Sequence, residues 1–193
     1  MVRTLLLFAM LFQTATQAAP KPVIDNDRVA VWDVTGPTSA QPLDAVVVSL
    51  SGNAEFLPKG MTPKITEEKS AAEKTAARSF VIDLKDHPVA PLANTTGYPL
   101  AFPRPGSKKL LENARVIVWD YTWTPGVATP MHFHDKDVVV IFLEDGDLSS
   151  TTPDGKVVMN SYTSGTVRFN ARDRTHTETL VRGKQRAIIV ELK

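Results

Sequence analysis

The chain has 193 residues, of which 42% are hydrophobic and 22% charged, with a formal net charge of +1. A nearly neutral chain without a basic run gives no electrostatic basis for binding nucleic acid or anionic lipid, so we expect a small-molecule partner. The lack of cysteine excludes zinc–thiolate sites, iron–sulfur clusters and cysteine nucleophiles, so any metal must be bound through nitrogen and oxygen.

The N-terminus has the pattern of a secretory signal. A short basic start with Arg3 precedes an apolar run over residues 4–12, which is too short to span a bilayer, and small and polar residues follow as far as Ala18. We predict a signal peptide over residues 1–18 and a secreted or periplasmic protein without membrane contact after cleavage. The alternative is a retained membrane anchor, but nothing after residue 12 lengthens the apolar run.

An internal repeat organises the mature chain. Residues 26–35 return as residues 113–122, with seven of the ten positions identical. Further correspondences follow in the same order: residues 44–48 with 137–141, Gly52 with Gly146, and residues 78–85 with 186–193. The repeat predicts two copies of one unit.

Short β-branched and apolar runs, separated by turn signals containing glycine, proline and aspartate, fill the second copy. This spacing is typical of antiparallel sandwiches and barrels, so we predict an all-β domain. The strands expected in the second copy cover residues 115–123, 138–143, 156–160, 166–169 and 187–192.

Two segments depart from the strand pattern. Residues 61–77 are rich in alanine, glutamate and lysine, which favours a short helix in place of strands in the first copy. Residues 87–111 contain five prolines and read as an ordered or semi-extended linker, in which His87 is a solvated loop histidine. The predicted units are therefore an N-terminal half over residues 22–86, this linker, and a C-terminal domain over residues 112–193.

Three of the four histidines form a candidate metal site. On an extended strand, His132 and His134 point to the same side, because side chains alternate with a period of two. His176 comes from a distant strand, and it can meet the other two only if the sheet curls into a barrel. Neutral imidazoles then leave open positions on the ion for water or substrate.

The spacing of these histidines resembles the two motifs of the cupin superfamily. Gly126, five residues, His132, one residue and His134 follow the first motif, which ends at Gly146; Gly165 and His176 follow the second. The resemblance implies a cupin-type double-stranded β-helix, a jelly-roll barrel, in two copies. In this bicupin the N-terminal copy is shortened and degenerate, since Pro42 stands where its first histidine would be.

The chain also departs from the cupin pattern, because Val139 stands at the position of the usual glutamate ligand. A divalent ion on three neutral ligands keeps its full charge and favours a small anionic ligand. Iron, zinc, manganese, nickel and copper are not distinguished. If the protein is an enzyme, the resemblance implies a metal-dependent oxidoreductase of the cupin dioxygenase type, or isomerase-like chemistry. The alternative is a non-catalytic ligand-binding or structural module, and cupins commonly pair as homodimers.

Four further residues are candidates for contact with the ligand. Glu178, two residues after His176, points to the same side of a regular strand and is the candidate catalytic residue, as a ligand, an orienting group or a base; the alternative is an exposed strand residue. Arg168 and Arg174 flank the third histidine and are candidates for binding an anionic group, although solvated rim arginines would look the same. Tyr121, on the strand that leads to the motif, is the fourth.

Overall fold

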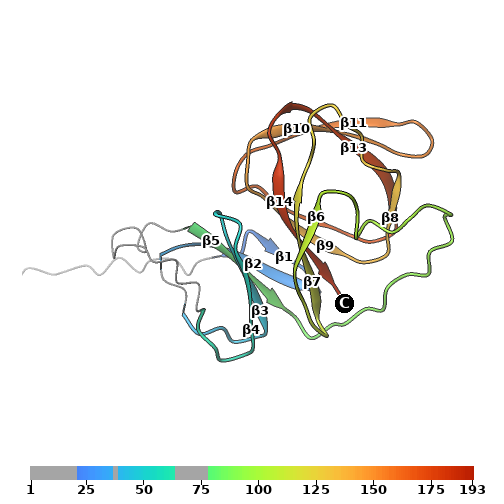
Figure 1. The fold of residues 1–193 in the computed structure, drawn as a ribbon. Helices are drawn as coiled ribbons and strands as arrows, with labels where there is room; N and C mark the ends of the chain where they lie inside the picture. The colour runs from blue at the N-terminus through green and yellow to red at the C-terminus, as the bar shows by residue number, and fades with distance from the viewer. Residues whose placement is uncertain (1–20, 37–38, 64–77) are drawn as a thin grey trace, which may run out of the picture.

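The computed structural model describes residues 21–36, 39–63 and 78–193 (Figure 1). The predicted signal peptide and residues 64–77 of the predicted helical stretch lie outside these ranges. Every regular element in the described part of the chain is a β-strand, as the sequence predicts. A search of the same residues finds no helix long and apolar enough to cross a membrane.

The C-terminal half consists of two antiparallel sheets that curl around a common interior (Figure 1). The first sheet contains, in spatial order, β12 (Val167–Asn170), β9 (Val138–Phe142), β14 (Arg186–Leu192), β7 (Val116–Thr122) and β6 (Ser107–Glu112). The second contains β11 (Val157–Tyr162), β10 (Gly146–Thr151), β13 (Arg174–Gly183) and β8 (His132–His134). From β7 to β14 the chain passes repeatedly from one sheet to the other, which is the winding of a jelly roll.

The central strands β9 and β14 of the first sheet are buried on both faces, which explains why they read as nearly continuous apolar runs. In β9, Val138, Val140 and Phe142 point into the barrel, while Val139 and Ile141 point out of it. The interior cluster is rich in aromatic side chains, and the outward side chains form a second cluster with the N-terminal half.

The described residues of the N-terminal half form one five-stranded sheet. Its spatial order is β1 (Ile24–Asp25), β2 (Val29–Thr35), β5 (Arg78–Leu84), β3 (Ala45–Ser49) and β4 (Ala54–Leu57). This order matches β6, β7, β14, β9 and β12 of the first sheet of the barrel, strand for strand. Within the described ranges the N-terminal half has no second sheet of its own, so these residues do not form a complete second barrel.

The register of this sheet also follows the repeat. Val81 of β5 lies between Trp32 and Val47, as Ile189 of β14 lies between Trp119 and Val140. The two tryptophans even share a partner type, since Trp32 Nε1 donates to Asp83 and Trp119 Nε1 donates to Glu191, both at 2.7 Å.

The correspondence of Gly52 with Gly146 is wrong. Gly52 lies two residues before β4, as Gly165 lies two residues before the equivalent strand β12, and both have positive φ. A Cβ atom on Gly52 would meet the guanidinium of Arg186, and one on Gly165 would meet that of Arg78. Gly52 therefore corresponds to Gly165, and the segment that carries Gly146 has no counterpart in the first copy.

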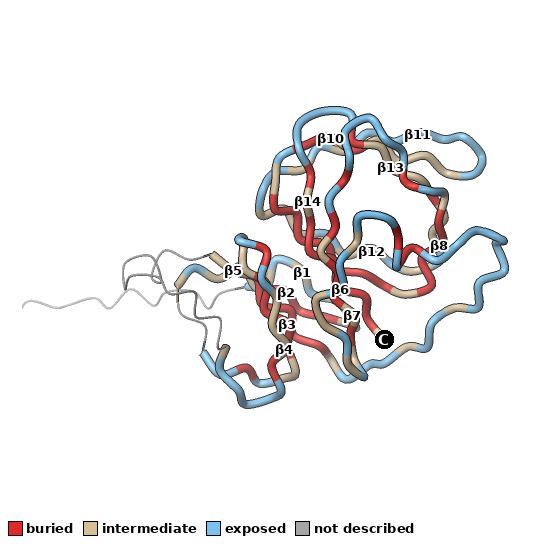
Figure 2. The backbone as a smooth tube through the Cα atoms, in the orientation of Figure 1, coloured by how far each residue is buried: buried red, intermediate tan, exposed pale blue. Residues whose placement is uncertain are grey.

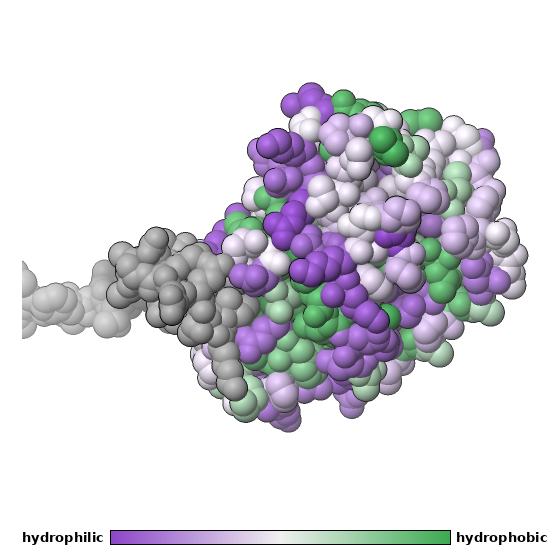
Figure 3. Space-filling model, viewed as in Figure 1, coloured by the Kyte–Doolittle hydropathy of each residue, from purple (hydrophilic) through white to green (hydrophobic). Residues whose placement is uncertain are grey.

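The two halves pack face to face through the outer surface of the first sheet. Apolar side chains of β2, β3 and β5 join those of β7, β9 and β14 in one buried cluster, and the buried segments of Figure 2 follow these strands. Hydrophilic side chains are spread over the face of the molecule in Figure 3. Two ion pairs cross the interface at equivalent positions of the repeat: Arg28 with Asp137, and Arg115 with Asp44.

The segment predicted as a linker, residues 87–111, is partly built into the barrel instead of only joining the two halves. Its last residues belong to β6, which pairs with β7 in the barrel wall. Upstream, the Ala101 amide donates to the Phe133 carbonyl, and the Phe133 amide donates to the Pro99 carbonyl, both at 2.9 Å. The prolines prevent a regular ladder of backbone hydrogen bonds here. The single hydrogen bonds to Phe133 still place the segment along the open edge of β8.

Candidate metal centre

The structure brings His132, His134 and His176 together inside the barrel. Strands β8 and β13 pair so that His132 lies directly opposite His176. The candidate ligand nitrogens of the three rings all lie within 4.8 Å of one another, and all three residues are buried. The prediction depended on a curled sheet that brings two strands together, and the structure contains this arrangement.

Two of the three ring nitrogens, those of His134 and His176, are spaced for one ion. His132 Nδ1 lies 2.8 Å from the Pro130 carbonyl, which can only accept, so Nδ1 carries the proton and Nε2 carries the lone pair. His134 Nε2 and His176 Nε2 are 3.2 Å apart. Two nitrogens bound to one ion at about 2.0–2.1 Å are separated by roughly 2.8–3.4 Å in octahedral (neighbouring ligands) or tetrahedral geometry, so this distance fits. The donor set suits a divalent metal.

All three imidazoles are held in the neutral form that binds metals. Burial, and then the positive charge of Arg104, lower the pKa of His132 to about 3. Burial and the charge of Arg174 lower the pKa of His134 well below its usual value. Burial also lowers the pKa of His176, although the carboxylate of Glu178 opposes the shift. Protons therefore compete poorly for this site at neutral pH.

These pKa shifts predict acid instability of the protein after a chelator has removed any metal. Between pH 6.5 and about 3, the unfolded chain binds a proton at His132 that the folded chain does not. The free energy of unfolding should therefore fall as the pH falls, by about 1.4 kcal/mol per pH unit for this group. Urea unfolding across this range measures it, and His132→Gln should flatten the slope by that amount; equal slopes would contradict the pKa assignment.

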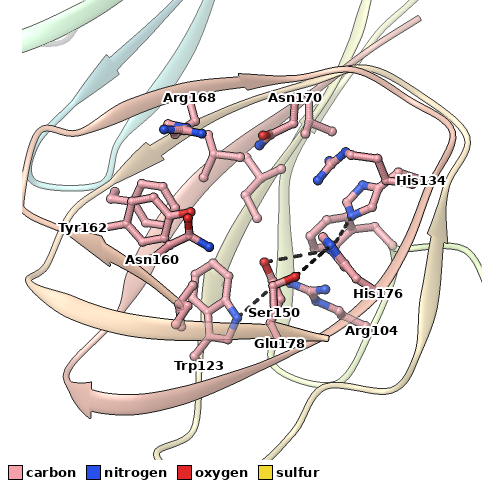
Figure 4. Close-up of a pocket in the computed structure, with 17 residues that line it drawn as sticks. Arg104, Trp123, His134, Ser150, Asn160, Tyr162, Arg168, Asn170, His176 and Glu178 are labelled. Atoms are coloured by element: carbon pink, nitrogen blue, oxygen red, sulfur yellow. Dashed lines mark hydrogen bonds and ion pairs between the residues drawn. The ribbon is translucent and has the colours of Figure 1, made fainter. Parts of the chain in front are cut away.

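Glu178 points into the same cavity as His176, as the period of two predicts (Figure 4). Its Oε2 accepts from Trp123 Nε1 at 3.2 Å and from Arg104 at 3.4 Å, and its Oε1 lies 3.9 Å from His176 Nε2. Burial alone would raise its pKa, but the charge of Arg104 and the hydrogen bond from Trp123 oppose burial, and the pKa is lowered. Glu178 is thus a carboxylate beside the histidines.

Besides Glu178, two of the other three residues predicted to contact the ligand reach the cavity. Arg168 and Arg174 line a space of about 150 Å³ together with His134, His176 and Glu178. Tyr121 does not line it, because its ring packs edge-on against Trp123 at 4.7 Å and lies under the guanidinium of Arg104 at 4.0 Å. The prediction for Tyr121 is not supported, and the side chain belongs to the barrel core.

The sequence reasoning missed several residues of the cavity. Arg104 and Phe102 come from the segment predicted as a linker, where no periodicity marks an inward side chain. Asn160 and Tyr162 alternate along β11 and share a face, a signal that could have been read from the predicted strand. The remaining missed polar side chains are Ser150 and Asn170.

Comparison with known proteins gives the following similarities. No family model matches the chain. A beta-alanine degradation protein, BauB, of Pseudomonas aeruginosa is 44% identical over 45 residues, which are 23% of this chain and 47% of that protein. The match thus spans about half the length of this curated relative.

Similar solved structures include cupin domains. A cupin domain from Bordetella pertussis is 27% identical, covers 47% of this chain and 97% of its own, and has a TM-score of 0.42. A cupin barrel protein from Leptotrichia buccalis is 12% identical over 94% of this chain and 92% of its own, with a TM-score of 0.47. The polyketide cyclase RemF from Streptomyces resistomycificus is 22% identical over 54% and 80%, with a TM-score of 0.37. Because these scores lie below 0.5, the jelly-roll assignment rests on the strand order of the chain itself.

Proposed function

We propose that the chain is an exported cupin that binds one divalent metal ion through His132, His134 and His176, and that it binds and transforms a small anionic molecule beside the ion. The observation that carries this proposal is the cluster of three buried, neutral imidazoles, two of which, His134 and His176, line one cavity. Three nitrogen ligands leave coordination positions open, and imidazole suits zinc, iron, copper and nickel.

The charges of the cavity support an anionic ligand. Three arginines line it, Arg104, Arg168 and Arg174, against one carboxylate, Glu178. A divalent ion would add two further positive charges, because none of the three histidines brings a negative one. Arg168 lies across the cavity from Trp123 and Glu178 (Figure 4), so a ligand held at the histidines can place a second anionic or polar group at the arginine side.

The chemistry of the site would be divided between the ion and the chain. A divalent ion supplies Lewis acidity, and iron or copper also supplies redox chemistry. Glu178 is ionised, and Trp123 and Arg104 both contact its Oε2, which leaves Oε1 on the side of His176. Oε1 is placed to accept a proton from a ligand bound at the histidines.

Metal analysis of the protein purified from the exported fraction tests the proposal. We expect one bound divalent ion per chain and a co-purifying small anion, identified by mass spectrometry. If the protein is an enzyme, turnover of that molecule, or oxygen uptake with it, should follow the metal content; a ligand returned unchanged would favour a non-catalytic binding module. Failure to bind zinc, iron, manganese, nickel or copper at a ratio of one to one would contradict the metal site.

A further inference from the structure

The cavity beside the histidines holds more positive than negative charge. Its charged lining residues are Arg104, Arg168, Arg174 and Glu178. Arg104 Nη2 lies 3.4 Å from Glu178 Oε2, so these two charges form a pair. Arg168 and Arg174 form no ion pair within the part of the chain that the structure describes. With neutral histidines, three arginines against one glutamate leave two positive charges without a partner.

Arg174 lies next to the metal-ligating cluster with one edge of its guanidinium available. It faces His134 across the pair of β8 and β13, and it comes two residues before His176 on the same side of β13. Its Nε donates to the Ala171 carbonyl at 2.8 Å, whereas its two Nη groups have no acceptor among the described residues. Arg174 is partly buried, while Arg168 is exposed and can be hydrated. A guanidinium held in this way presents two parallel N–H donors to a carboxylate.

The size of the cavity limits the length of the ligand. Its volume is about 150 Å³. An apolar cavity of roughly this volume holds one benzene molecule, so the space suits a ligand of about six to eight non-hydrogen atoms. Part of the wall is apolar, because Val138, Val140 and Ile189 also line the cavity. A short hydrocarbon chain between two charged ends therefore fits both the volume and the wall.

We propose, on the basis of the metal site proposed above, that the ligand is an aliphatic dicarboxylate of about three or four carbons. One carboxylate lies at the histidines, where it supplies the anionic ligand that a divalent ion on three neutral nitrogens favours. The other carboxylate is bound by the two Nη groups of Arg174. The two negative charges match the two unpaired positive charges of the cavity.

Calorimetric titration of the zinc-loaded protein tests the class of ligand. After one equivalent of Zn²⁺ has bound, malonate and succinate are compared with propionate and butyrate, which have the same carbon chains but one carboxylate. We expect the dicarboxylates to bind about 10- to 100-fold more tightly, because each gains a charged hydrogen-bonded pair with Arg174. The Zn²⁺ that the protein retains after titration is measured, so that extraction of the ion by the free acid is detected.

Adipate tests the limit on length. Because it is longer than succinate, it exceeds the cavity and should bind less tightly than succinate does. Equal affinity for dicarboxylates and monocarboxylates would overturn the inference, and tighter binding of adipate would overturn the assigned length.

Substitution of Arg174 tests which residue binds the second carboxylate. In Arg174→Gln, the affinity for malonate should fall to within several-fold of that for propionate, and the affinity for propionate should change several-fold at most. Arg174→Lys keeps the charge but not the planar fork, so it should recover only part of the loss, and it repeats the test if the glutamine variant does not fold. Arg168→Gln is the matched control, since it removes an exposed charge from the same cavity, and it should lose several-fold at most.

The outcomes separate this inference from the proposed function. Equal losses of malonate affinity in Arg174→Gln and Arg168→Gln would show that the overall charge decides binding, and the role of Arg174 would be wrong. If Zn²⁺ binds at one to one and dicarboxylates bind no more tightly than monocarboxylates, the class of ligand is wrong and the metal site stands. If neither the wild type nor the variants bind Zn²⁺, the proposed function fails and this inference fails with it.

Discussion

Replacing His134 with alanine is expected to weaken metal binding by about 100- to 1,000-fold. Structural zinc sites with four protein ligands gain about 10–16 kcal/mol, hence about 2.5–4 kcal/mol per ligand, which corresponds to that factor. His134 is 6% exposed, and within the described ranges the metal-ligating cluster contains only the two other histidines, so the variant keeps two of the three nitrogen ligands. Competition titration with a chromophoric chelator measures the loss.

The fourth histidine provides the control for this measurement. His87 is exposed and belongs neither to the cluster of the other three histidines nor to the lining of the cavity beside it. His87→Ala should therefore bind the metal as tightly as the wild type does. Unchanged affinity in His134→Ala would mean that the ion binds elsewhere on the chain, whereas equal losses in both variants would indicate adventitious binding by surface histidines.

The strands that the sequence predicted are mostly those of the sheet buried on both faces. Its members β7, β9 and β14 are mostly apolar or β-branched, β12 alternates apolar and polar residues, and all four match a predicted strand to within two residues. The second sheet was largely missed because one face lines a polar cavity and the other meets solvent. Its strand β13 reads RTHTETLVRG, and β8 has only three residues, so neither carries a hydrophobic signal.

The repeat predicted a relation between the halves but not the extent of the first copy. In the C-terminal half, residues 143–166 between β9 and β12 contain β10 and β11. The corresponding connection between β3 and β4 is the turn over residues 50–53. A turn of this length cannot supply two strands, so the described part of the first copy lacks a place for the cavity that the second copy encloses.

The candidate ligands were predictable because a motif fixes their spacing, whereas Arg104 was not. His132 and His134 share a face of one strand, and Glu178 shares a face with His176, so a period of two finds both relations. Arg104 reaches the site through contacts of its segment with β8, which no local pattern encodes. The same arginine explains the failure for Tyr121: it lies over the tyrosine ring and separates it from the cavity.

Replacing Asp137 with alanine is expected to lower the free energy of unfolding by about 3–5 kcal/mol, the usual loss when one partner of a buried ion pair is removed. The side chains of Arg28 and Asp137 are each only 10% exposed. Asp137 Oδ1 also accepts from the Arg172 amide at 2.8 Å. Burial lowers the pKa of Arg28, and the negative charge of Asp137 opposes this shift. Denaturant unfolding measures the loss.

The repeat supplies a matched control for the same interface. Asp44 occupies the equivalent position, but it and its partner Arg115 are 31% and 29% exposed, at a distance of 3.3 Å. Asp44→Ala should therefore cost about 1 kcal/mol or less, because water screens the pair. In the double variant Arg28→Met/Asp137→Leu, no unpaired charge remains, so most of the stability lost in Asp137→Ala should return. Equal losses in the two single variants would show that burial does not decide the strength of these pairs.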